Sequence, residues 1–156
     1  MADEQLKYIL DANVFIEAYR HYYAFDLCPG FWASITHCGE QGILGSIDRV
    51  RDELKKEDNL GQWRSHLSAE FFHPTDTDDV IDAYTEVINW AQGETRLTAA
   101  AKAAFADDAD AWLVAYAKAK GLLVVTRETS KPESKKNLKL PDVCHAFGIK
   151  YNTATT

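Results

Sequence analysis

Hydrophobic and polar positions along the chain follow two periods, one typical of buried strands and one typical of amphipathic helices. Short apolar runs at residues 7–10, 43–44 and 122–126 predict strands, and the last is the strongest because it contains adjacent valines. Residues 79–91 carry apolar side chains at three- and four-residue spacing, which predicts a helix that Gly93 ends. Predicted strands and helices therefore follow one another along the chain.

The remaining segments are assigned from residues that start, end or interrupt helices. Ser46 is a favourable N-cap and Gly121 a favourable C-cap, so each marks a predicted helix boundary. Residues 25–41 contain Pro29 and two glycines, which predicts a loop or a broken helix. The other predicted helices cover residues 14–23, 46–57, 63–68, 107–120 and 141–147, and the other extended segments cover residues 71–73 and 149–152.

Alternating strands and helices predict a three-layer α/β/α sandwich around a central, mainly parallel sheet. The chain has 156 residues, which is enough for one domain spanning residues 1–156. Ligand sites in such folds lie beyond the carboxyl ends of the strands. Candidate chemistry is therefore expected where the predicted strands end.

Charge narrows the function classes. Acidic side chains outnumber basic ones by 24 to 17, giving a formal net charge of −7. Because lysine and arginine supply most of the affinity for nucleic acid, this balance argues against a general DNA-binding module. It does not exclude a nuclease, since divalent metal makes an acidic pocket attractive to phosphate. The same charge also agrees with an ordinary solvated surface.

The sequence has none of the features of membrane insertion or secretion. The most apolar stretch, residues 111–126, is interrupted by two lysines and Gly121. The N-terminal residues lack the basic start and long apolar core of a signal peptide. Three cysteines without CxxC spacing indicate neither a disulfide framework nor a zinc site: Cys28, Cys38 and Cys144. We expect a cytoplasmic protein with no membrane partner.

Four acids fall where the site is expected. Asp11 follows the first strand and Glu128 follows the strongest one, whereas Glu53 lies on the helix after the second strand and Asp110 near the start of the helix leading into residues 122–126. Converging carboxylates repel one another and lose hydration, so proteins keep them where a hard cation such as Mg²⁺ or Mn²⁺ neutralises them. The pattern favours metal-assisted phosphoryl chemistry.

Each acid also has an ordinary explanation, which the sequence leaves open. Asp11 and Glu128 suit turns after strands, and Glu53 suits a solvated helix face two turns into its helix. Asp108 and Asp110 suit the first turn of a helix, where the dipole favours negative charge.

The order of these segments resembles the PIN domain across nearly the whole chain. The resemblance is carried by YILDANVFIEAYR, SIDRVRDELKK and DDADAWLVAYAKAKGLLVVTRETS. It implies a metal-dependent ribonuclease whose ligands to Mg²⁺ or Mn²⁺ are Asp11, Glu53 and Asp110, with Glu128 as a fourth acid in place of the family's usual aspartate. The supporting residues that it implies are Asn13 and Thr126.

The closing segment LKLPDVCHAFGIKYNT resembles a less-studied PIN-like branch in which a Pro-Asp step opens the last helix. That resemblance makes Asp142 a weaker candidate ligand, and Asp108 is a second spare. Small PIN proteins of this size are commonly the toxins of bacterial toxin–antitoxin pairs, so an RNA substrate, an antitoxin partner and a homodimer are implied.

Basic and aromatic residues near the acids are candidate RNA contacts, although a solvated surface explains them equally well. One set is Arg20, His21, Tyr22 and Tyr23, and the other is Arg127, Lys131, Lys135 and Lys136.

Three alternatives to a nuclease remain in view. A haloacid-dehalogenase-like phosphatase needs a second acid two residues after its nucleophile, where this chain has Asn13. A phospho-receiver needs an acidic pair near the first strand and an aspartate after a middle strand, and neither is present. A PIN fold that has lost activity and acts as a scaffold is the strongest alternative.

Overall fold

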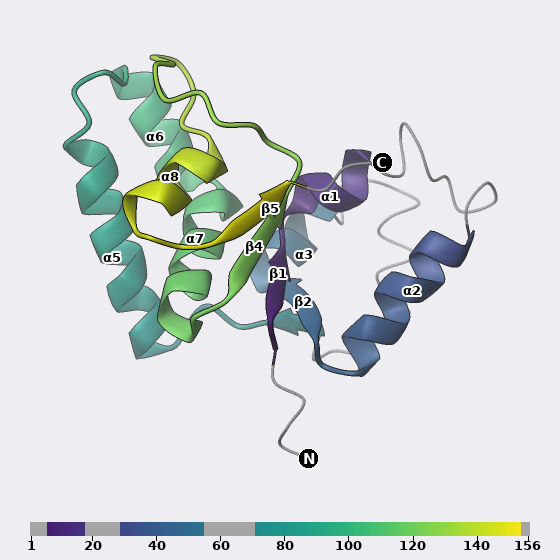
Figure 1. The fold of residues 1–156 in the computed structure, drawn as a ribbon. Helices are drawn as coiled ribbons and strands as arrows, with labels where there is room; N and C mark the ends of the chain where they lie inside the picture. Colours follow the sequence, from purple (N-terminus) through teal and green to yellow (C-terminus); the bar gives the residue numbers. More distant parts are fainter. Residues whose placement is uncertain (1–5, 18–28, 55–70, 154–156) are drawn as a thin grey trace.

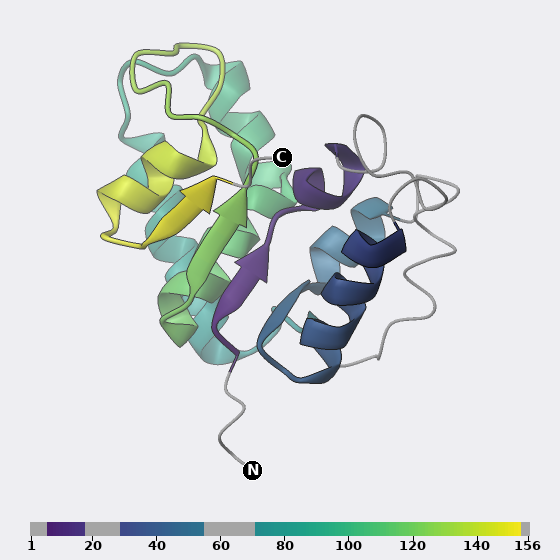
Figure 2. The same cartoon turned by 45° about the vertical axis from the view of Figure 1, so that its right-hand side comes forward.

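The computed structural model describes residues 6–17, 29–54 and 71–153. Its sheet has five strands, all parallel, in the order β3-β2-β1-β4-β5. Figure 2 shows β1, β4 and β5 running in the same direction. The strands are β1 (Tyr8–Leu10), β2 (Leu44–Ile47), β3 (Phe72–His73), β4 (Leu123–Thr126) and β5 (Tyr151–Thr153).

The strand order contains one reversal, and it lies between β1 and β4. The chain runs from β1 outward to β2 and β3, then returns past β1 to form β4 and β5. In the register, Tyr8 pairs with both Leu44 and Leu123. Connections leave β1 and β4 in opposite directions, so the carboxyl ends of these two strands border a crevice.

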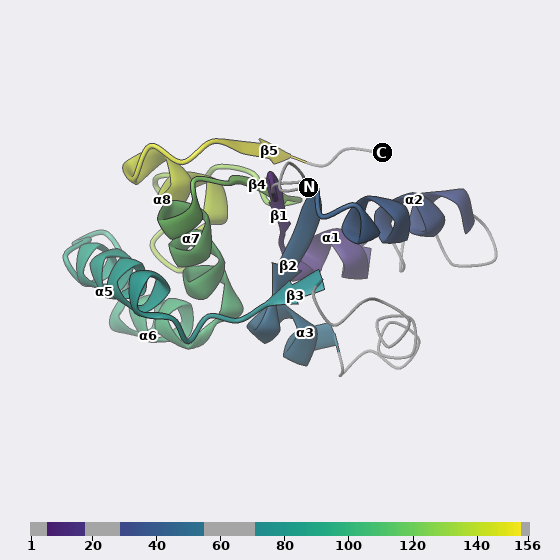
Figure 3. The ribbon, with the colours of Figure 1, turned by 90° about the horizontal axis from the view of Figure 1, so that it is seen from below.

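Seven helices are described. They are α1 (Ala12–Glu17), α2 (Pro29–Glu40), α3 (Asp48–Leu54), α5 (Asp78–Gln92), α6 (Ala99–Asp107), α7 (Ala109–Lys120) and α8 (Leu140–Ala146). Figure 1 shows the sheet between α2 on one side and α5, α7 and α8 on the other, and the view along the sheet in Figure 3 shows the same separation. The predicted α/β architecture with a parallel sheet is confirmed.

Helix α7 is the centre of the core on its side of the sheet. Its buried side chains include Leu113, Val114 and Tyr116, and it packs along α5, whose Val80 and Val87 are also buried. Gly121 ends α7 at φ 71°, a left-handed conformation that glycine adopts without steric cost. Helix α7 packs against α5 on one side and against the sheet on the other. The acids in its first turn therefore have a fixed position relative to the sheet.

The prediction that Ser46 caps a helix is wrong. Ser46 lies inside β2, fully buried, and its hydroxyl donates a 2.6 Å hydrogen bond to the carbonyl oxygen of Leu10. Helix α3 begins at Asp48, whose carboxylate accepts hydrogen bonds from the backbone N–H and the hydroxyl of Thr75. The side chain of Ser46 thus supports the end of β1.

Two helical segments differ from expectation. Residues 29–40 form a continuous helix that starts at a proline, a favoured first position, instead of a loop or a broken helix. Its Gly39 lies so close to Phe71 that an added Cβ would be 2.5 Å from the ring. Helix α6 was not predicted, and the expected helix over residues 107–120 starts later because Asp108 is extended and separates α6 from α7.

The other predicted elements agree with the structure to within a few residues, as far as they are described. The predicted helix over residues 63–68 lies outside the described residues, as do the ends of those over residues 14–23 and 46–57. Cys38 and Cys144 are free thiols. None of the described helices is long and apolar enough to cross a membrane.

Candidate active site

Asp11 lies at the crevice between β1 and β4. Its backbone N–H donates to the carbonyl of Val125 at 3.0 Å, which extends the pairing of β1 with β4 by one residue. Its side chain is 1% exposed. The hydroxyl of Thr126 donates to its Oδ2 at 3.1 Å, and the backbone N–H of Asn13 also donates to the carboxylate. Two donors, one at the end of β4 and one in the first turn of α1, therefore fix this buried carboxyl group.

Glu128 is joined to Asp11 through the same threonine. The hydroxyl of Thr126 accepts a hydrogen bond from the backbone N–H of Glu128 at 3.0 Å while it donates to Asp11. The Oε1 atom of Glu128 accepts from the backbone N–H of Leu140 at 2.7 Å, at the start of α8. Thr126 is fully buried, so the link is protected from water.

Asp110 reaches the same place from the first turn of α7. It is preceded by Asp108, the N-cap residue, whose carboxylate accepts from the backbone N–H of Asp110 at 3.5 Å. Asp110 lines a cavity of about 120 Å³ together with Asp108 and Glu128. Two basic residues line this cavity as well, Lys136 and Lys139.

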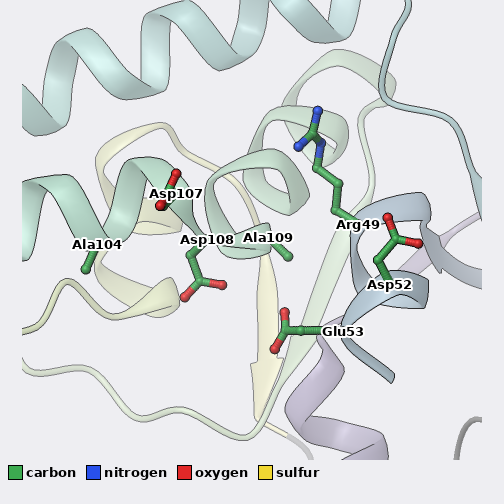
Figure 4. A pocket seen from close by; sticks show the side chains of 7 residues that line it. All are labelled: Arg49, Asp52, Glu53, Ala104, Asp107, Asp108 and Ala109. Atoms are coloured by element: carbon green, nitrogen blue, oxygen red, sulfur yellow. The ribbon is translucent and has the colours of Figure 1, made fainter. Parts of the chain in front are cut away.

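Glu53 lies in the second turn of α3 and lines a larger cavity, of about 460 Å³, with Asp108. Figure 4 shows the carboxylates of Glu53 and Asp108 directed toward one another. Arg49 lines this cavity too, but its guanidinium lies 4.1 Å from the centre of the Trp112 ring and its Nε donates to Thr75 at 3.2 Å. The cationic group is thus held on the α5 side of the cavity.

The charges of these acids act on one another. Burial, and then the charge of Glu128, raise the pKa of Asp11 to about 7, although the hydrogen bonds from Thr126 and Asn13 oppose the shift. Glu53 adds a smaller contribution in the same direction. Burial, and then the charge of Asp11, raise the pKa of Asp110 well above its usual value, with further contributions from Asp108, Glu128 and Glu53.

We call Asp11, Glu53, Asp110 and Glu128 the acid cluster. They come from the residue after β1, from α3, from α7 and from the segment after β4, and their charges act on one another. Helix capping by a carboxylate normally lowers its pKa, because backbone N–H groups stabilise the charged form. For Asp11 burial and repulsion outweigh its hydrogen bonds, so its position is unfavourable for the protein without a positive partner.

The donor chemistry of the acid cluster fits a hard divalent cation, which prefers carboxylate and hydroxyl oxygens. Among the described residues, however, no group of three or more His, Cys, Asp or Glu side chains has the close spacing of a formed metal site. Glu53 and Glu128 have the longest side chains of the cluster. Because the acids are not closely spaced, the side chains of Glu53 and Glu128 must rotate toward Asp11 and Asp110 to bind a shared ion.

The two weaker candidate ligands, Asp108 and Asp142, have different surroundings in the structure. Asp108 borders both cavities beside Asp110. Asp142 instead accepts hydrogen bonds from the Ser130 hydroxyl and, at 2.9 Å, from the backbone N–H of Lys131. This arrangement fixes the loop after β4 and accounts for Asp142 without a metal. Asn13 supports the site through its backbone N–H.

The structure describes the surroundings of some of the candidate RNA contacts. Of the basic set after β4, Lys136 lies beside Asp110 and Glu128, and Lys139, which the sequence analysis missed, lies there too. It directly precedes the Leu140–Ala146 helix that Glu128 contacts, a contact that no sequence pattern indicates. Arg20, His21, Tyr22 and Tyr23 lie outside the described residues.

A family model described as a domain of unknown function (DUF4411) matches residues 8–156. The chain belongs to this family. The DUF4411 match begins at β1 and so includes every member of the acid cluster. A comparison with curated proteins returned no match. The family description names no activity, and the parallel α/β fold is compatible with the resemblance to PIN domains.

Proposed function

We propose that this DUF4411 protein is a metal-dependent endoribonuclease. The observation that supports it best is the acid cluster at the reversal of strand order, where Asp11 is buried with its pKa raised to about 7. A protein gains nothing in stability from mutually repelling buried carboxylates. Sites with perturbed pKa values in a crevice are typical of catalysis or metal binding.

Mg²⁺ or Mn²⁺ held by Asp11, Glu53 and Asp110, with Glu128 as the fourth ligand, would supply activation of water and stabilisation of the attacked phosphate. The protein's own part is positioning. Thr126 holds the carboxylate of Asp11 toward the crevice and ties the backbone of Glu128 to it.

Lys136 and Lys139 stand at the cavity where a phosphate would approach Asp110. Their ammonium groups would attract the RNA backbone to an otherwise acidic edge. The proposal extends, on the PIN resemblance and chain size, to a toxin regulated by an antitoxin partner and to a homodimer.

The decisive test compares wild type, Asp11→Asn and Asp110→Asn on structured and unstructured RNAs with Mn²⁺ or EDTA. Cleavage should need Mn²⁺ and should fall in both variants by more than the roughly 10- to 100-fold that loss of an outer-shell partner causes. Asp82→Asn, an exposed acid on α5, is the matched control and should keep full activity.

Cleavage that survives both EDTA and the Asp11→Asn substitution would refute the mechanism. Calorimetric titration with Mn²⁺ separates an enzyme from a scaffold. Saturable binding to wild type that Asp110→Asn abolishes supports the proposed site, whereas absence of binding together with absence of cleavage supports an inactive PIN-like scaffold.

A further inference from the structure

A separate cavity of about 630 Å³ opens at the opposite edge of the sheet, where the parallel strands begin. The cavity is lined by the starts of β1 and β4, by the last turn of α7 and by the segment between α8 and β5. Among the residues that the structure describes, its lining contains four lysines and neither aspartate nor glutamate, in a chain with 24 acidic and 17 basic residues. We call it the lysine groove; its lysines are Lys7, Lys118, Lys120 and Lys150.

Two of these lysines already hold carboxylates of α5. The Nζ of Lys118 lies 2.8 Å from Oε1 of Glu86, and the Nζ of Lys120 lies 2.8 Å from Oδ2 of Asp79. The other two, Lys7 and Lys150, are exposed and form no salt bridge with any part of the chain that the structure describes. Within the described residues, two ammonium groups of the groove therefore lack a carboxylate partner.

The floor of the groove is apolar. Leu122 is buried there, and Phe147 and Ile149 are half-buried and pack against the core. The ring of Phe147 contacts Trp90 edge-on, with centroids 5.7 Å apart, and the Nζ of Lys118 lies 6.0 Å from its centre. Because neighbours already engage this ring, it is a poor platform for stacking a base, which single-stranded RNA requires.

We propose that the lysine groove binds an acidic, amphipathic segment of a protein partner. Carboxylates of the segment pair with Lys7 and Lys150, and its apolar side chains cover Phe147 and Ile149. Charge complementarity selects this occupant, since the described lining of the groove holds four lysines and no carboxylate. The length of the strands separates the groove from the acid cluster, so docking leaves that cluster uncovered. The inference does not depend on the proposed nuclease activity.

The test uses the full chain and a fluorescein-labelled peptide of alternating Glu and Leu, with binding followed by fluorescence anisotropy. Reversing both charges, in Lys7→Glu with Lys150→Glu, should weaken binding about tenfold or more, as expected for the loss of two surface ion pairs and the gain of repulsion. The control is Lys131→Glu with Lys135→Glu, which makes the same charge change at exposed lysines on the other edge of the sheet. It should bind as wild type does.

Amide chemical shifts keep the test independent of folding changes in the variants. In the wild-type chain, peptide-induced shifts at Tyr8, Leu123 and Ile149 support docking in the groove. The proposal is overturned if wild type shows no saturable binding, if the two double variants weaken equally, or if the shifts lie elsewhere. It is also overturned if a peptide with Ser in place of Leu binds as tightly, or if an RNA oligonucleotide takes the groove in preference to the peptide.

Discussion

The two edges of the parallel sheet carry charges of opposite sign in different surroundings. At the carboxyl edge, Asp11 is 1% exposed and the pKa of its carboxyl group is raised to about 7 by burial and by Glu128. At the amino edge, Lys118 and Lys120 lie at the surface and are paired with carboxylates of α5. Helix α7 joins the edges, with Asp110 in its first turn and these lysines in its last.

This difference between the two edges shows which charged side chains the stability of the fold explains and which it does not. Lysines at the C-terminus of α7 follow its dipole and keep their hydration, so they are compatible with stability alone. Asp110 follows the dipole too, but it is also half-buried and repelled by Asp11. Carboxyl groups kept in place against both burial and repulsion are typical of functional sites, and this is why the acid cluster carries the proposed activity.

The largest effect that should distinguish the two edges is stabilisation of the fold by metal. At pH 8, Mn²⁺ at a hundredfold excess over its Kd should raise the free energy of unfolding by about 2.7 kcal/mol, because only the folded chain assembles the acid cluster. Urea unfolding with Mn²⁺ and with EDTA measures this difference. Lys7→Gln, at the other edge, should keep the gain and Asp11→Asn should lose most of it. An equal gain in Asp11→Asn would contradict the assignment.

A smaller effect is expected from pH in the absence of metal. The pKa of Asp11 is about 7 in the folded chain and 3.8 as the ordinary value, so between these values the folded state binds more protons than the unfolded state. The free energy of unfolding should therefore fall as pH rises from about 4 to about 7, and this contribution should then level off. The raised pKa of Asp110 acts in the same direction.

Asp11→Asn removes the charge and should flatten this dependence. At pH 8 in EDTA we expect the variant to be about 1–2 kcal/mol more stable than wild type, less than the full pKa shift implies because Asn matches the hydrogen bonds of Asp11 imperfectly. Thermal unfolding across this pH range provides the measurement, with Asp82→Asn as the control. A destabilised Asp11→Asn at pH 8 would mean that Asp11 serves the fold alone.

The smallest effect is expected at the amino edge. Lys118→Met removes an exposed ion pair with Glu86 and should change the free energy of unfolding by less than about 0.5 kcal/mol. High salt should abolish what difference there is, because screening acts fully on surface charges. Urea unfolding at two salt concentrations measures this change. If Lys118→Met lowered the free energy of unfolding by as much as Mn²⁺ raises it, the two edges would not differ as proposed.

The sequence predicted the acids of the cluster as a set, from the order of the segments, because each acid alone also had an ordinary explanation. Apolar strands ending in Asp11 and in the segment before Glu128 place acids at one edge of any parallel sheet. Glu53 was harder to place, since its position two turns into a helix also suits solvent. It approaches Asp110 because α3 starts directly after β2, at Asp48.

Other features of the structure were not predicted, because they depend on contacts between distant residues that no local sequence pattern indicates. Ser46 looks like a helix cap, yet its partner is the carbonyl of Leu10, 36 residues away. Helix α6 is rich in alanine, so it shows no contrast between apolar and polar faces, and its clearest local sign is the cap at Thr98. Lys139 was missed because nothing in the sequence places the loop after β4 against α7.

The hydrogen bond between Thr126 and Asp11 joins residues 115 positions apart. Contacts of such separation form late, since the intervening chain must first be ordered. A ribosome-bound chain that ends before β4 has Asp11 but lacks the hydroxyl that orients it. Whatever chemistry the carboxylates perform is thus withheld during translation until residue 126 has been made and β4 has paired with β1.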